Sequence, residues 1–203
     1  MADSVTFHFD PVCPWTWLSS RWVLEVADQT GLEVTWQSFS LPLLNEGKEI
    51  PDEFKAGMEV SKQATRVVQH LADAGRNDGV GAFYTAIGTA LHPGGAEKTP
   101  ELVVRALREA GLADAEELAA VARDPRADAA VKVAHDRALE LVGEDVGSPI
   151  IITAAGNAVF GPVVSPVPKG DDAVAIWEAS RTLADIATFH ELKRGRGGGP
   201  DYS

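Results

Sequence analysis

The chain has 203 residues, of which 45% are hydrophobic and 24% charged, as in soluble globular proteins that form one domain, with or without a large insertion. It has 30 acidic and 18 basic residues, no long basic block and no stretch near the ~20 apolar residues of a membrane span, so we expect neither nucleic acid nor a membrane as a partner. The first ten residues lack a signal-peptide pattern and the single cysteine excludes an internal disulfide, which together favour a cytoplasmic location.

The first part of the chain has the pattern of a strand, a helix and a second strand. Residues 4–9, "SVTFHF", are rich in β-branched and aromatic side chains and predict a strand. A helix should begin at Pro14, where the missing N–H of proline costs nothing, and end at Gly31. Residues 32–38, "LEVTWQS", alternate apolar and polar side chains, which predicts a half-buried second strand in a parallel pair.

The middle of the chain is helical in pattern, and strands return only after it. Residues 51–143 are rich in alanine, show no strand-like alternation and predict four or five helices. Residues 148–153, "SPIIIT", are typical of an interior strand, and residues 158–164, "AVFGPVV", follow so closely that the two strands must pair antiparallel. A last helix is expected over residues 170–189, and the tail "GRGGGPDYS", residues 195–203, is expected to be loose.

This order of elements predicts an α/β fold. A strand–helix–strand unit, a helical block and a strand–strand–helix unit follow one another, which is the order of a thioredoxin-like fold with an all-helical insertion. We assign residues 1–45 and 144–203 to the thioredoxin-like domain and residues 46–143 to the helical insertion domain. The two outer segments must meet in space, because neither alone can cover a sheet.

The only cysteine, Cys13, is expected at the junction between the first strand and the first helix. Free N–H groups and the positive end of the helix dipole stabilise a thiolate at such a place, so we expect a pKa well below the ordinary value of about 8.5 and a nucleophilic sulfur. The alternative is that Cys13 is a small buried hydrophobic residue.

Thr16 stands three residues after Cys13, where a second cysteine would make a redox pair. Its side chain should face the same end of the helix as the sulfur, and its hydroxyl can donate a hydrogen bond to the thiolate. It cannot attack a mixed disulfide, so a second thiol must arrive from solution. The alternative is a neutral residue at a helix N-terminus.

At "CPWT" and "GEDVGSPIII" the sequence resembles the DsbA-like branch of the thioredoxin superfamily. More narrowly, it is similar to the actinobacterial mycothiol-dependent reductases, also called mycothiol-dependent nitroreductases, whose motif is CPWC. The similarity runs nearly end to end. It rests also on the stretches "DPVCPWTW", "SRWVLEVA", "SLPLLNE", "PDEFKAGM", "FGPVVSP" and "HELKR".

The resemblance implies a DsbA-type fold with the helical insertion over the active site, Cys13 as nucleophile, and a cis Ser148–Pro149 peptide facing it. Phe54 stands where the family has tyrosine, which removes a hydroxyl contact. His92 either reaches the cleft from the insertion or caps a helix end. The residues that we assign to substrate or thiol binding are Pro14, Trp15, Asn45, Phe54, His92, Ser148 and Pro149.

Three functions stay open. The first is a thiol-disulfide oxidoreductase in which mycothiol, or else glutathione, forms a mixed disulfide on Cys13 and a second thiol releases it. The second is a thiol transferase or isomerase, of the kappa-transferase or chromene-carboxylate isomerase type, in which a bound thiol attacks an electrophile and Cys13 only polarises it. The third is a non-catalytic thiol-binding protein.

The expected partners follow from these functions. They are a low-molecular-weight thiol and an electrophilic or disulfide substrate, handled by a monomer or a homodimer. The five histidines are scattered along the chain without the short spacing of metal ligands, so we expect no metal.

Overall fold

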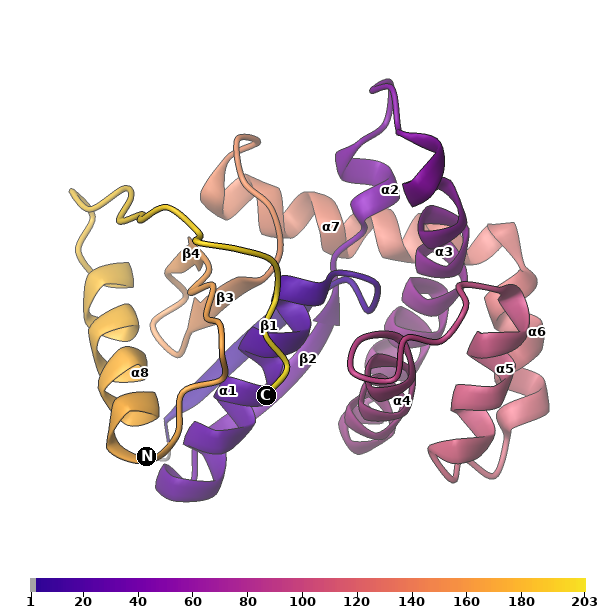
Figure 1. Cartoon of the computed structure of the whole chain (residues 1–203), viewed down its shortest axis with the longest axis horizontal. Helices are drawn as coiled ribbons and strands as arrows, with labels where there is room; N and C mark the ends of the chain where they lie inside the picture. Colours follow the sequence, from indigo (N-terminus) through magenta and orange to yellow (C-terminus); the bar gives the residue numbers. More distant parts are fainter. Residues whose placement is uncertain (1–2) are drawn as a thin grey trace.

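The structure is a computed structural model that describes residues 3–203, and it is built around a four-stranded sheet (Figure 1). The strand order is β2-β1-β3-β4. The first strand pairs parallel with the second, and the third pairs antiparallel with the fourth, as predicted. The first and third strands also pair, in antiparallel orientation. The strands are β1 (Ser4–Phe9), β2 (Glu33–Ser38), β3 (Ile150–Thr153) and β4 (Ala158–Phe160).

Helix α1 (Pro14–Thr30) joins the two parallel strands and has the predicted ends. Its proline occupies the first turn, and the backbone of Gly31, with φ of 74°, closes the last turn through an N–H that donates to the Ala27 carbonyl at 2.9 Å. One face of the helix is buried, including Leu18 and Trp22. Local sequence thus sets the ends of this helix, and its buried face packs against the rest of the fold.

The helical insertion lies between β2 and β3 (Figure 1). Within the described residues it contains no strand and five helices of nine residues or more, the upper number that the sequence predicts. A short helix and a 3-10 turn were not predicted. The elements are α2 (Leu41–Leu44), α3 (Asp52–Asp73), α4 (Asn77–Leu91), α5 (Pro100–Glu109), α6 (Ala115–Arg123), η1 (Pro125–Ala127) and α7 (Asp128–Val142).

A cluster of aromatic rings joins this insertion to the sheet and to α1. Tyr84 of α4 stacks on Phe9 of β1 with ring centroids 3.9 Å apart, and it meets Trp17 of α1 edge-on at 5.6 Å. Trp36 of β2 meets the same tyrosine edge-on at 5.9 Å. Aromatic pairs in such geometries add about 0.5–1.5 kcal/mol each beyond their area burial. One hydrophobic core therefore runs through both parts of the chain.

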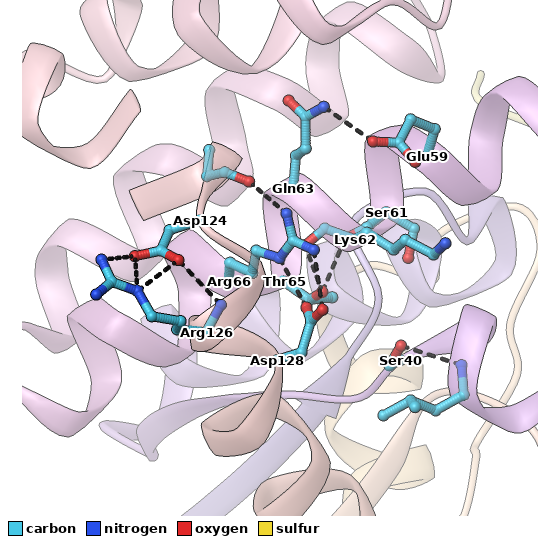
Figure 2. A network of polar contacts seen from close by, with 12 residues as sticks. Ser40, Glu59, Ser61, Lys62, Gln63, Thr65, Arg66, Asp124, Arg126 and Asp128 are labelled. Carbon is cyan, nitrogen blue, oxygen red and sulfur yellow. Dashed lines mark hydrogen bonds and ion pairs between the residues drawn. The ribbon is translucent and has the colours of Figure 1, made fainter. Parts of the chain in front are cut away.

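Charged contacts hold the helices of the insertion to one another (Figure 2). The guanidinium of Arg66, on α3, donates to both carboxylate oxygens of Asp128 at 2.7 and 2.9 Å and to the Ala122 carbonyl at 2.9 Å. Because the two acceptors belong to the end of α6 and the start of α7, one side chain fixes three helices at once.

The chain after β3 differs from its prediction in two places. Strand β4 stops at Phe160 because Pro162, two residues later, has no N–H for the ladder. Helix α8 (Gly170–Ala184) ends five residues early and packs on α1, where the indole N–H of Trp22 donates to the Ala173 carbonyl at 2.9 Å. Among the described residues, no helix combines the length and apolar character needed to cross a bilayer.

Candidate active site

Cys13 occupies the N-cap position of α1, directly after the loop that leaves β1. Its N–H donates to the Asp10 carbonyl at 3.1 Å, and its own carbonyl accepts the first helical hydrogen bond from Trp17 at 3.0 Å. The predicted place of the sulfur at a strand–helix junction is therefore confirmed. The residue is only 8% exposed, so its sulfur lies just below the surface.

The cis Ser148–Pro149 peptide lies opposite the cysteine, as predicted. It precedes β3, which pairs with β1, so the sheet brings two distant segments together. The carbonyl oxygen of Ser148 lies 4.0 Å from the Cys13 sulfur, within reach of a weak S–H donor. The hydroxyl of Thr16, fully buried, donates to Ser148 Oγ at 2.8 Å. Cysteine, threonine and serine thus form one compact cluster.

The electrostatics of Cys13 differ from the prediction. Burial raises the pKa of the Cys13 thiol above its ordinary value, and the charge of Asp10 acts in the same direction. Hydrogen bonds from the Thr16 hydroxyl and from the backbone of Thr16 and Trp15 lower the pKa, as expected at a helix N-terminus, but they do not outweigh burial. The expected low pKa is therefore wrong, because burial shifts the pKa of this thiol upward.

A buried carboxylate under the cysteine loop was missed by sequence reasoning. Asp10 is fully buried and accepts hydrogen bonds from the N–H of Val12 at 2.9 Å, the N–H of Leu41 at 2.8 Å, and the hydroxyl of Ser61. Burial raises its pKa to about 6, although the three hydrogen bonds oppose this. A signal existed, because a charged residue between a buried strand and the "PVCP" loop has little access to water.

His92 is the C-cap residue of α4, and its ring contacts the cysteine loop; its role in thiol binding stays a prediction. Its Nε2 is 3.0 Å from the Pro11 carbonyl oxygen, and because a carbonyl can only accept, this nitrogen carries the proton. Burial lowers the pKa of His92 to about 4. The ring is therefore neutral at neutral pH. It holds the cysteine loop at Pro11, two residues before Cys13.

The tryptophans of α1 differ in exposure. Trp17 and Trp22 are buried in the core. Trp15 is half-buried, with the guanidinium of Arg196 4.4 Å from its ring centroid. Pro14, the other expected binding residue of the motif, is the half-buried first residue of α1.

Asn45 and Phe54 are not brought to the sulfur by any hydrogen bond that the described residues make. The Asn45 amide donates to the Leu41 carbonyl of its own helix at 2.8 Å. Phe54 is 49% exposed in the first turn of α3, and Gly57, one turn later, packs so closely that a Cβ there would stand 3.3 Å from Val12 of the cysteine loop. The start of α3 therefore borders the site, and the roles of both residues stay predictions.

A buried sulfur at the head of a helix, faced by a cis-proline loop on the neighbouring strand, defines a thioredoxin-like protein of the DsbA type. The chain belongs to the Rv2466c-like family: the model of that family, described as mycothiol-dependent nitroreductase Rv2466c, matches residues 12–194. It is also similar to the protein Rv2286c of Mycobacterium tuberculosis, with 32% identity over 199 residues that cover 94% of this chain and 81% of that protein.

Solved structures share the fold at lower identity. A "probable DsbA oxidoreductase" from Streptomyces coelicolor superposes with a TM-score of 0.60 and 21% identity over 98% of this chain and 97% of its own. The cytosolic disulfide reductase DsbM from Pseudomonas aeruginosa, solved with GSH, has a TM-score of 0.58 and 16% identity over 89% of this chain and 100% of its own. Over residues 3–203, no group of three or more histidine, cysteine, aspartate and glutamate side chains is placed to hold a metal ion.

Proposed function

We propose that this member of the family is a monothiol, mycothiol-dependent reductase of the cytoplasm with Cys13 as its nucleophile. The observation that carries the proposal is the cluster of Cys13, Thr16 and Ser148, in which a hydroxyl stands where a dithiol enzyme needs its second sulfur. A sulfur so placed can form a mixed disulfide but cannot resolve it within the chain.

The reaction then needs two external thiols. The Cys13 thiolate attacks the mycothiol sulfur of a mixed disulfide between mycothiol and a substrate. The old sulfur–sulfur bond breaks, the substrate thiol leaves with a proton, and mycothiol stays on Cys13. A second mycothiol thiolate attacks that mixed disulfide, which yields mycothiol disulfide and restores Cys13. The electron pair that reduces the substrate comes from the two mycothiols.

The chain's own residues support each step. Ser148 and Thr16 hold the sulfur at a fixed place, and the Thr16 hydroxyl can turn from Ser148 Oγ to a thiolate as the proton leaves. Trp15 follows Cys13 by two residues and His92 holds the carbonyl two residues before it, and we assign both to the body of the thiol. Glutathione is the alternative thiol, supported by the neighbour DsbM, which was solved with GSH.

Intact-mass measurement tests this proposal. The reduced protein is incubated with mycothiol disulfide, and we expect the mass of one mycothiol on the wild-type chain and none on Cys13→Ser. Because Cys13 is the only cysteine, no other thiol competes. Excess mycothiol should then remove the adduct. A wild-type chain that stays unmodified after prolonged incubation contradicts the monothiol mechanism.

One observation favours a second function, that of a thiol transferase or isomerase. Burial raises the pKa of Cys13, and a protonated thiol is a hydrogen-bond donor that can polarise a bound thiol without attacking anything. In that case mycothiol binds tightly and reacts with an electrophile, yet mycothiol disulfide leaves no adduct. Calorimetric titration with reduced mycothiol, run beside the mass measurement, distinguishes the two functions.

A further inference from the structure

The segment of residues 187–203 contains neither helix nor strand. Its last part, residues 195–203, was predicted to be loose but makes specific contacts with the rest of the chain. Figure 1 shows its yellow trace leaving the end of α8, crossing in front of the sheet and ending in the region of α1. We call it the strap. Its backbone is tied at Asp201, whose N–H donates to Ser165 Oγ at 2.9 Å.

Two side chains of the strap contact residues next to the cysteine loop, Trp15 and His92. On one side the guanidinium of Arg196 covers the Trp15 ring at 4.4 Å, two residues after the cysteine. On the other side the Tyr202 ring stacks on His92, with centroids 6.2 Å apart and an interplanar angle of 28°. His92 in turn holds the loop carbonyl two residues before the cysteine.

Tyr202 lies over the histidine that holds the cysteine loop. Burial raises the pKa of its phenol, and a negative charge on Cys13 would act in the same direction. The residue is 38% exposed, so it lies at the surface and covers the His92 side of the cysteine loop.

Few contacts hold the strap. An aromatic pair or a cation–π contact of this kind contributes about 1 kcal/mol. Each contact therefore changes the ratio of chains with the strap in place to chains with the strap lifted by roughly fivefold. Most strap side chains are exposed, and none of them enters the large core cluster. The strap can therefore lift without unfolding the chain.

We propose that the strap sets the substrate class of Cys13: it admits small thiols and small disulfides and excludes disulfides held in folded proteins. This inference rests on the proposed function, since it takes Cys13 as the reacting group. A protein disulfide brings its flanking backbone with it and needs the surface between Trp15 and His92 clear, which the strap occupies. A small disulfide needs only a transient gap beside Tyr202.

The first experiment measures access to the sulfur. Iodoacetamide alkylation of Cys13 is followed against pH, and the rate at the high-pH plateau reports access without the influence of the pKa. The variant Tyr202→Ala, which loses one contact, should react roughly fivefold faster than wild type, and a chain ending at Arg194, which loses both, roughly 25-fold faster. Tyr202→Phe keeps the ring, and Leu192→Ala removes an apolar strap side chain that is 83% exposed, so both should match wild type.

The second experiment measures selection. Mixed-disulfide formation is compared for a small aromatic disulfide, dithiobis(nitrobenzoate), and for the protein insulin. Removal of the strap should raise the insulin rate at least roughly tenfold more than the rate with the small disulfide. Equal acceleration of both, or an unchanged plateau rate in Tyr202→Ala and the shortened chain, overturns the proposal. If the shortened chain is unfolded by circular dichroism, Tyr202→Ala alone decides. Neither measurement uses mycothiol, so a failure of the proposed function is detected separately by the mycothiol adduct.

Discussion

Replacing Thr16 by valine tests how the site ionises its sulfur. The valine has the shape of threonine without the hydroxyl that now donates to Ser148 Oγ at 2.8 Å and that lowers the pKa of Cys13. The hydroxyl has one proton, so ionisation exchanges a neutral hydrogen bond of about 0.5–1.5 kcal/mol for one to a charged group of about 1.5–3 kcal/mol. The difference is about 1.4 kcal/mol, or a tenfold change in the fraction of thiolate.

The assay is the rate of alkylation against pH. In Thr16→Val we expect a rate about tenfold below wild type at neutral pH and the same plateau at high pH, because the pKa rises while access is unchanged. Thr16→Ser retains the hydroxyl and is the matched control. A neutral-pH rate in Thr16→Val that equals or exceeds that of wild type refutes the assigned role of the hydroxyl.

Three further predictions concern charge and packing. Asp10→Asn should lower the pKa of the Cys13 thiol, because the carboxylate charge raises it; thiolate absorbance against pH measures the change. Burial lowers the pKa of His8 from 6.5 to about 4, so the unfolded chain takes up a proton first and the free energy of unfolding falls as the pH drops through this range. In urea titrations, wild type should lose about 2 kcal/mol of unfolding free energy between neutral pH and pH 5 through this group, and His8→Gln should not show that part of the loss. Gly88→Ala should cost about 1–3 kcal/mol of unfolding free energy, because a Cβ there would stand 2.2 Å from the Trp17 ring.

Each of these has a clear contrary result. An unchanged or higher thiol pKa in Asp10→Asn means that the carboxylate does not act on the sulfur. A variant at His8 that loses as much stability on acidification as wild type assigns that loss to other groups. Gly79→Ala, on the same helix, meets Leu112 at an ordinary 3.4 Å and should cost nothing, so equal destabilisation by both alanines would falsify the packing argument at Gly88.

Local sequence was sufficient for most of the fold. Apolar periodicity and the residues at the ends predicted β1 and α1 because both depend on near neighbours. Helix α2 was missed, since four residues with a proline show no period, and its start depends on the Ser40 hydroxyl that accepts from the Leu43 N–H at 3.3 Å. The assigned division at residues 45 and 144 stays a prediction.

Non-local contacts account for the other differences. The end of α8 is set where the Asp185 carboxylate accepts hydrogen bonds from Thr153 and Asn157 of the β3–β4 hairpin, at 3.0 and 2.9 Å. Residues 185–189 continue the apolar pattern of the helix, so the sequence did not indicate this earlier end. In the same way, the helix dipole at Cys13 is a local property, whereas the burial that raises its pKa is created by segments more than a hundred residues away, including Ser148.

The buried carboxylate of Asp10 has a mechanical consequence. Its two oxygens receive hydrogens from three separate elements, the cysteine loop through Val12, α2 through Leu41 and α3 through Ser61. Any tilt of α3 away from the strands must pull the Ser61 hydroxyl off this acid, and an acid deprived of a donor holds its proton more tightly. The charge of this acid, which raises the pKa of the Cys13 thiol, is therefore coupled to the packing of α3 against the strands.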